Sequence, residues 1–251
     1  MIREILPWLK NRYLKVRNHY KSLPSGARMN LTARDSINMF QSARYGRYAV
    51  FDVKTTGFDM TRDRIVAIGA VRIENGRIRL GQSFNRTVNP AIQMSEESGK
   101  AHRSGPQPAL SVSSAGSVVN AFLEFAGRDI LVAHCAEVGA GFLNRFMKRR
   151  YGFGLQNIVL DTMALSRNFL LPDVDLNSAW WNKTFGAGSN RRTQPRYNLD
   201  ELARYLGILI RNRHSGIGDA LVTGMVFQCI LAQAEKRRMD RLAHLISLGG
   251  V

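Results

Sequence analysis

The chain has 251 residues, of which 45% are hydrophobic, and 36 Lys and Arg residues against 19 Asp and Glu residues give it a formal net charge of +17 at pH 7. This length and hydrophobic content allow a substantial core and fit one domain with appendages better than two full domains. The positive charge favours nucleic acid as a partner over acidic proteins or neutral ligands. A merely basic soluble protein, or one that sits near an anionic membrane surface, is the alternative.

The two cysteines, Cys135 and Cys229, lie in no C-x-x-C pair and in no Cys/His cluster with zinc spacing. This argues against a disulfide framework and a structural metal, so both are expected to be free, buried thiols. No uncharged run reaches the roughly 18 to 20 residues that span a bilayer, and charges interrupt the N-terminus too often for a signal peptide. A cytoplasmic location without a transmembrane segment is therefore expected.

The N-terminal segment has the pattern of a basic amphipathic helix, because apolar residues recur at helical spacing through residues 1–23 with Lys and Arg between them. Its apolar face would pack on its own domain or bind a partner protein, nucleic acid or a membrane surface. Residues 27–46 predict a shorter helix, so that residues 1–46 form a basic helical extension.

Strand patterns begin at Tyr48, and Asn75-Gly76 between two apolar runs is a strong hairpin signal. The expected strands are 48–53, 64–73, 77–88, 130–133 and 158–160. The expected helices are 95–102, 117–126, 141–150, 162–169, 199–206 and 218–236, followed by a basic helical tail over 236–251. This interleaving of strands and helices predicts an α/β protein with a mixed sheet that is covered on both faces.

Residues 171–196 are expected to form a long irregular insertion, a kind of segment that is often functional. Its aromatic and basic side chains are Trp180, Trp181, Lys183, Arg191, Arg192 and Arg196. Aromatic rings and cations together are used to bind single strands, although Trp pairs also anchor lids.

Three separated segments carry the candidate site residues. Residues 50–58 read Val-Phe-Asp-Val-Lys-Thr-Thr-Gly-Phe, residues 131–143 read Leu-Val-Ala-His-Cys-Ala-Glu-Val-Gly-Ala-Gly-Phe-Leu, and residues 213–220 read Arg-His-Ser-Gly-Ile-Gly-Asp-Ala. Strand side chains alternate between faces, so Asp52 and Lys54 point the same way. A carboxylate beside an ammonium is a poor start for a cation site.

Together the three segments resemble the DEDD 3′-5′ exonucleases of the His-containing branch, the group of the bacterial DNA polymerase III epsilon subunit, over roughly residues 47–232. The first is similar to the family's Asp-x-Glu-Thr-Thr-Gly, the second to Ala-His-Asn-Ala-x-Phe-Asp followed by Phe-Leu, and the third to His-x-x-x-x-Asp-Ala. The resemblance implies a ribonuclease H-like domain over 47–235, with a five-stranded mixed sheet whose central strand is 48–53 and helices on both faces.

The resemblance also implies a site in which four carboxylates hold two divalent ions, Mg²⁺ or Mn²⁺, and a histidine takes the proton of the attacking water. Asp52 and Asp219 match two of the four ligands, and His214 matches the general base. The other two ligand positions differ. Lys54 stands where the family has Glu, and Gly139 stands where it has Asp.

Four further residues match the family loop that meets the terminal nucleotide of the substrate. They are Thr55, Thr56, Gly57 and Phe58. Their backbone and hydroxyl groups would contact the nucleotide, and the phenyl ring would stack on a base or wedge against it. The alternative is an ordinary turn with a core aromatic side chain.

The charge at position 54 decides what this site is expected to do. A complete site holds four negative charges against two divalent ions, whereas this one holds two and already contains a cation. We expect two-metal binding to be lost or severely weakened, with Lys54 bridging Asp52 and Asp219 in place of the first metal. Two alternatives are that Glu137 serves as a substitute ligand, or that Lys54 contacts the scissile phosphate.

Three functions follow from this pattern. The leading hypothesis is an epsilon-type exonuclease homologue whose hydrolysis is lost or weakened and which still binds single-stranded DNA or RNA or a protein partner. The second is an active metal-dependent 3′-5′ exonuclease. The third is an interaction scaffold that docks a partner through the N-terminal helix.

Overall fold

A five-stranded mixed sheet forms the centre of the protein. The computed structural model describes residues 20–34, 37–88, 114–170, 198–209 and 213–251. The strands are β1 (Arg47–Thr55), β2 (Ile65–Glu74), β3 (Arg77–Thr87), β4 (Ile130–Ala133) and β5 (Val159–Asp161). Their order is β3-β2-β1-β4-β5; β1 is antiparallel to β2, β2 to β3, and the pairs β1–β4 and β4–β5 are parallel. The central strand is β1, as the resemblance implies.

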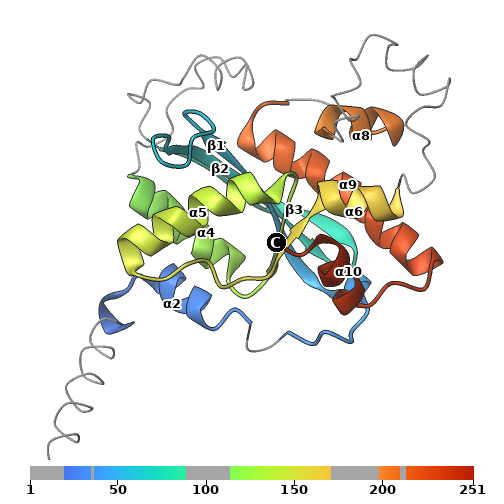
Figure 1. Cartoon of the computed structure of the whole chain (residues 1–251), viewed down its shortest axis with the longest axis horizontal. Coiled ribbons are helices and arrows are strands. Elements are labelled where there is room, and N and C mark those ends of the chain that lie inside the picture. Colours follow the sequence, from blue (N-terminus) through green and yellow to red (C-terminus); the bar gives the residue numbers. More distant parts are fainter. Residues whose placement is uncertain (1–19, 35–36, 89–113, 171–197, 210–212) are drawn as a thin grey trace, which may run out of the picture.

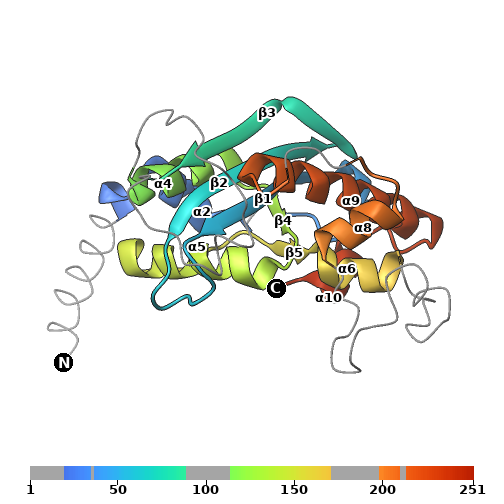
Figure 2. The same ribbon diagram turned by 90° about the horizontal axis from the view of Figure 1, so that it is seen from above.

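Helices cover both faces of the sheet. They are α2 (Ser25–Leu31), α4 (Ala115–Ala126), α5 (Ala136–Tyr151), α6 (Thr162–Phe169), α8 (Leu199–Tyr205), α9 (Gly216–Lys236) and α10 (Leu242–Gly249), with a 3₁₀ turn, η1, at Ala43–Tyr45. In Figure 1, α2, α4 and α5 lie to the left and α6, α8, α9 and α10 to the right, and Figure 2 shows the sheet between the two groups.

The alternation of side chains along β1 divides the core into two halves. Ala49 and Phe51 pack with α2, α4 and α5, whereas Tyr48 and Val50 pack with α6, α9 and α10. Continuing the alternation places the side chain of Asp52 on the α9 face. The site is therefore built on the face that α9 covers.

The hairpin between β2 and β3 has the turn that its sequence predicts. Asn75 and Gly76 have φ values of 53° and 69°, the left-handed conformation that a two-residue hairpin of this kind requires at both positions. The strands and helices largely confirm the sequence expectations, with bounds that shift by one or two residues. The expected helix 95–102, the N-terminal helix and the insertion 171–196 lie outside the described residues.

Three expectations about elements were wrong. Residues 27–46 do not form one helix: α2 ends at Leu31, and the chain then pairs with the segment before α10, where Ala43 N donates to Asp240 O at 2.6 Å and Leu242 N to Gln41 O at 3.0 Å. These tertiary hydrogen bonds replace the helical ones. In addition, α2 packs against α4, where Gly26 N donates to the Asn120 side chain at 3.1 Å.

The second error is the start of α5, which begins at Ala136 rather than at residue 141. Gly139 and Gly141 have low helix propensity and made this stretch look irregular. The third is the tail, which is not a basic helix. Basic residues end α9 and follow it, whereas α10 is apolar and buries Leu242 and Leu245 completely.

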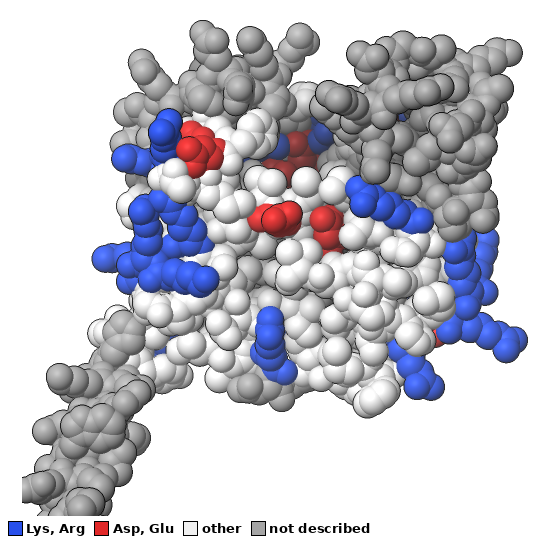
Figure 3. Space-filling view, in the orientation of Figure 1, with Lys and Arg blue, Asp and Glu red and all other residues white. Residues whose placement is uncertain are grey.

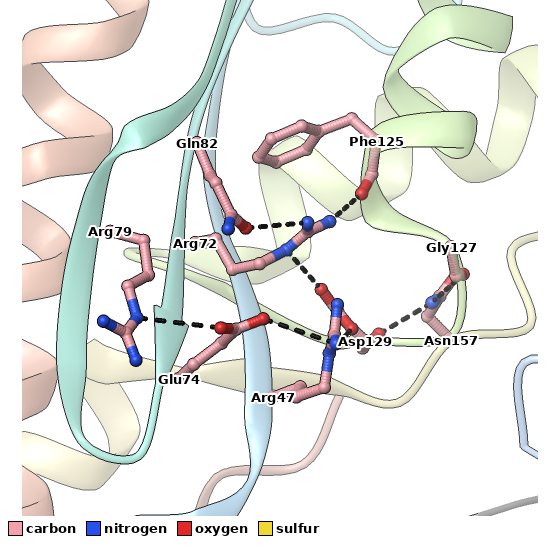
Figure 4. Close-up of polar contacts among 9 residues, drawn as sticks. All are labelled: Arg47, Arg72, Glu74, Arg79, Gln82, Phe125, Gly127, Asp129 and Asn157. Carbon is pink, nitrogen blue, oxygen red and sulfur yellow. Dashed lines mark hydrogen bonds and ion pairs between the residues drawn. The ribbon is translucent and has the colours of Figure 1, made fainter.

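A polar network ties the start of β4 to β1 and β2, at the end of the sheet away from Asp52. Asp129, with a side chain 7% exposed, accepts from Arg47 Nε at 3.1 Å and Arg72 Nε at 2.9 Å, and its main-chain oxygen accepts from Asn157 Nδ2 at 2.8 Å. Figure 4 shows Arg47 and Arg72 converging on this carboxylate, with Glu74 beside them. The network pairs a buried charge and links three neighbouring strands of the sheet.

The longest helix that the structure describes, α9, is long and apolar enough by composition to cross a membrane, but 61% of its most apolar stretch is buried within the protein. It packs mainly on β1 and β2. Its apolar character is therefore accounted for by its place as the core helix.

Candidate active site

The site lies where the C-terminal end of β1 meets the N-terminus of α9. Two glycines make this approach possible. Gly69 is the β2 partner of Asp52, and a Cβ atom built on Gly69 would lie 2.1 Å from the carbonyl carbon of Gly216 at the start of α9. Any side chain at position 69 would push the helix away. The close contact places Asp219, in the first turn of α9, over Asp52 and its strand neighbour.

Lys54 lies between the two predicted carboxylate ligands. Its Nζ is 3.0 Å from Asp52 Oδ2 and 2.5 Å from Asp219 Oδ2, and only 7% of its side chain is exposed. The bridge expected from the sequence is therefore present. The contact to Asp219 is a hydrogen bond, whereas the contact to Asp52 is an ion pair, so Asp52 Oδ2 is buried without a hydrogen-bond partner.

The carboxylates keep Lys54 charged. Burial by itself would lower the pKa of the ammonium, but Asp52 and Asp219 outweigh burial, so the pKa of Lys54 is raised. Burial raises the pKa of Asp52, and the attraction of Lys54 opposes that rise. Each group of the pair therefore stabilises the charged form of the other.

A second cation, Arg213, holds the other oxygen of Asp219. Arg213 Nη1 contacts Asp219 Oδ1, and its Nε donates to Asp200 Oδ1 of α8 at 2.6 Å. This hydrogen bond is the main reason that the pKa of Asp200 is lowered. Arg213 was not among the predicted site residues, although its place next to His214 was an available signal. Asp200, from a separate helix, carried no signal.

His214 contacts Asp219 through its main chain. Its N–H donates to Asp219 Oδ1 at 3.0 Å, and its φ of 67° is uncommon for a residue other than glycine. Ser215 then caps α9, because its Oγ accepts from Gly218 N at 3.1 Å. The carboxylate of Asp219 thus organises the turn into α9 as well as pairing with two cations. The role of His214 as a general base stays a prediction.

The second altered position, Gly139, lies on the other side of β1. A Cβ atom at Gly139 would be 3.4 Å from Phe51 and 3.7 Å from Val53, which are ordinary contacts. The position therefore has space for a side chain on its α5 side. Glu137 is exposed in the first turn of α5, as expected for a structural Glu near a helix N-terminus. Its service as a substitute ligand stays untested.

The residue that caps α5 corrects one expectation. Cys135 and Cys229 are free thiols, but Cys135 is exposed and Cys229 is only partly buried, whereas both were expected to be buried. The φ of Cys135, 57°, is left-handed, and its N–H donates to Asp161 Oδ1 at 3.0 Å, so the turn between β4 and α5 carries the side chain outward. His134 before it contacts Thr162 Oγ1 through Nδ1 at 3.0 Å.

The predicted substrate loop, residues 55–58, begins at the last residue of β1. Thr55 Oγ1 donates to Gly57 O at 2.6 Å, and Thr56 Oγ1 donates to Asp63 Oδ1 at 2.7 Å. The two hydroxyl protons are therefore used within the loop, and Thr55 and Thr56 are buried, so the Phe58 ring is the surface that this loop offers to a ligand. The Phe58 residue is 54% exposed.

The residues present do not fit the two-metal centre that the family resemblance implies. The buried oxygen of Asp52 is 3.0 Å from an ammonium, and Asp219 pairs with Lys54 and Arg213 through its two oxygens. Within the part of the chain that the structure describes, no three His, Cys, Asp or Glu residues are grouped to hold a metal. The residues disagree with a two-metal centre in their charge, since cationic side chains of the protein pair with the carboxylates that would bind the metal ions.

The family is identified by comparison with known proteins. A family model described as exonuclease, RNase T, matches residues 49–227. A DNA polymerase III subunit epsilon-like protein of Rhodobacter capsulatus is 33% identical over 203 residues, which cover 80% of this chain and 26% of that protein. The DNA polymerase III subunit epsilon of Aquifex aeolicus is 26% identical over 79% of this chain and 87% of its own length.

Longer relatives match through a small part of their length. The DNA polymerase III PolC-type protein of Clostridium perfringens is 29% identical over 76% of this chain, and the match spans only 12% of that protein. Among solved structures, E. coli exonuclease I in complex with a dT13 oligonucleotide has a TM-score of 0.59 at 14% identity, covering 77% of this chain and 42% of that one. Exonuclease X with 5′ overhanging duplex DNA has a TM-score of 0.51 at 17% identity, covering 77% and 97%. These likenesses establish the ribonuclease H-like exonuclease fold.

Proposed function

Because this chain belongs to the RNase T exonuclease family, we propose that it is an epsilon-like homologue whose metal-dependent hydrolysis is lost or strongly weakened and which retains nucleic-acid binding. One observation carries the proposal. The ammonium of Lys54 lies between Asp52 and Asp219, where the family pattern places a metal ion. The carboxylates that would attract the ion are already neutralised.

Coulomb's law sets the scale of the effect. Two unit charges about 4 Å apart interact with about 4 kcal/mol at an effective dielectric constant of about 20, and a divalent ion doubles this. An ion that entered beside Lys54 would meet this repulsion and would also compete for carboxylates already paired with Lys54 and Arg213. Two altered ligand positions, Lys54 and Gly139, remove the compensating negative charges.

Nucleic-acid binding is supported by the positive net charge and by the ligands of structurally similar proteins. The net charge of +17 favours a polyanion, and the solved relatives include complexes with a dT13 oligonucleotide and with overhanging duplex DNA. The exposed Phe58 beside the site offers a ring for base stacking. Single-stranded DNA or RNA is the proposed ligand.

A nuclease assay tests the loss of hydrolysis. The purified protein is incubated with an end-labelled single strand and Mg²⁺ or Mn²⁺, beside the Lys54→Glu plus Gly139→Asp variant. We expect no metal-dependent trimming by the unmodified chain and measurable trimming by the variant. Addition of Asp52→Asn to that variant should abolish its activity, which controls for a contaminating nuclease. Metal-dependent trimming by the unmodified chain that Asp52→Asn removes would refute the proposal.

A further inference from the structure

A basic cavity lies beside the substrate loop, on the α5 side of β1. It has a volume of about 330 Å³, within the usual range of ligand pockets, and lies between the β1–β2 loop and α5. The half-buried Phe146 supplies apolar surface above the buried Phe142, and Arg64, Arg145, Arg149 and Arg150 supply guanidinium groups. The α5 residues 142, 145, 146 and 149 follow helical spacing, so one face of the helix presents rings and cations together.

Among the residues that the structure describes, few carboxylates lie near the guanidinium groups of this cavity. Its lining contains one carboxylate, Asp63, whose two oxygens already accept from Thr56 Oγ1 at 2.7 Å and Asp59 N at 2.9 Å. Across the described ranges, none of the four arginines forms an ion pair with an acidic residue of the protein. On the face shown in Figure 3, blue side chains gather over the C-terminal half of α5.

Arg145 points to the kind of ligand. Its Nη2 donates to Thr61 O at 2.6 Å, which anchors the guanidinium against the β1–β2 loop, while its Nη1 is buried without a hydrogen-bond partner. A buried donor without an acceptor is costly, and an anionic oxygen in the cavity would satisfy it. The guanidinium is thus anchored, with one buried donor group left unsatisfied.

The cavity and the substrate loop share a wall. Asp63 lines the cavity and also binds Thr56, and a Cβ atom on Gly57 would lie 2.4 Å from Asp63 Oδ2, so the loop packs directly on this carboxylate. Met60 of the loop packs against α5, because a Cβ atom on Gly141 would lie 2.6 Å from the methyl carbon of Met60. A single nucleic-acid strand whose end lies at the substrate loop would reach the cavity along the protein surface.

We infer that this cavity is a subsite for one nucleotide of a single strand, with the base against the half-buried Phe146 and the phosphates at Arg145 and Arg149. The inference rests on the proposed nucleic-acid binding and names where the strand runs. A larger cavity at the other end of the sheet is a weaker candidate, because its Arg47 and Arg72 are already paired with Asp129.

Binding of a fluorescein-labelled oligothymidylate, measured by anisotropy over a series of salt concentrations, tests the subsite. Each phosphate contact on a single strand contributes about 0.7 to the slope of log affinity against log salt, so Arg145→Gln with Arg149→Gln should reduce the slope by about 1.4 and weaken binding about tenfold. A second variant, Arg149→Gln with Arg150→Gln, changes only exposed side chains and keeps the anchor of the loop. It should weaken binding in the same direction.

The matched control removes the same charge elsewhere. Lys236→Gln with Arg241→Gln changes two exposed cations, one at the end of α9 and one just before α10. In Figure 1 the C-terminal end of α9 lies on the opposite side of the molecule from α5. This variant should leave the salt slope nearly unchanged. If the control and the subsite variants weaken binding equally, the subsite is refuted while nucleic-acid binding stands. If the unmodified chain does not bind the oligonucleotide, the proposed binding function fails and the subsite with it.

Photocrosslinking locates the base independently of affinity. An oligothymidylate carrying 5-iododeoxyuridine, crosslinked to the full chain and analysed by mass spectrometry, should label the peptide that contains Phe142 and Phe146. Labelling confined to other peptides would overturn the assignment.

Discussion

Replacement of Lys54 by methionine measures how strongly this cation holds the site together. The substitution keeps the length and volume of the side chain but removes the ammonium from between Asp52 and Asp219. Removing one partner of a buried ion pair typically costs about 3 to 5 kcal/mol, because the other charge stays buried and unpaired. Asp219 keeps Arg213 and the N–H of His214, and the Asp52 side chain is 26% exposed, which places the expected cost near the low end, about 3 kcal/mol.

Urea unfolding followed by far-UV circular dichroism gives the free energy directly. For a domain of 150 to 250 residues, about 3 kcal/mol corresponds to a fall of roughly 6 to 12 °C in Tm. The control is Arg44→Met, since the Arg44–Glu235 pair has side chains 51% and 53% exposed and should contribute about 0 to 1 kcal/mol. Adding Asp52→Asn to Lys54→Met should recover much of the loss because it removes the orphaned charge. A loss below about 1 kcal/mol for Lys54→Met, or no recovery in the double variant, would refute the account of the bridge.

Three further predictions follow from the same packing and charges. Gly69→Ala should destabilise the fold by about 2 kcal/mol or more, because the new Cβ would lie 2.1 Å from the Gly216 carbonyl carbon. Thermal unfolding measures the loss, and Gly81→Ala is the control, because a Cβ atom there meets nothing within 4 Å. Asp129→Ala should lower the free energy of unfolding by about 3 kcal/mol, because it leaves the Arg72 side chain, 16% exposed, without its carboxylate partner. Urea unfolding measures this loss, and an Asp129→Ala protein as stable as the unmodified chain would contradict the prediction. Folding raises the pKa of Lys54. The stability that the charged Lys54 contributes is therefore complete below the unfolded pKa of about 10.4 and is lost as pH rises through the folded pKa. The free energy of unfolding should fall more steeply above about pH 10 in the unmodified protein than in Lys54→Met.

Much of the fold could be predicted because its signals are local. The apolar runs of β1, β2 and β4 and the Asn75-Gly76 turn carry their structure in the residues themselves. The elements that were predicted incorrectly depend on distant partners. Residues 39–43 exchange main-chain hydrogen bonds with residues 240–243 instead of continuing a helix, and α5 begins early because packing on β1 and Met60 favours the glycines at its N-terminal end.

The candidate site divides in the same way. Strand alternation alone predicted that Asp52 and Lys54 share one face of the sheet, and the order and spacing of the three motifs predicted that Asp219 lies next to them. Arg213 was adjacent in sequence to a predicted site residue, but its contact with Asp219 depends on how the chain turns into α9. The cavity between the β1–β2 loop and α5 combines residues about 80 positions apart, which no local pattern could associate.

The amino-acid sequence by itself determined the sheet, its central strand and the meeting of a cation with two carboxylates, because strand periodicity and three ordered motifs specify them. Only the tertiary structure decided how completely those carboxylates are neutralised. The approach of α9 over Gly69 brings Asp219 within 2.5 Å of Lys54, and the turn before α9 brings Arg213 to its other oxygen. Such pairing depends on atomic distances between separate elements, and electrostatic energy changes steeply with distance and burial.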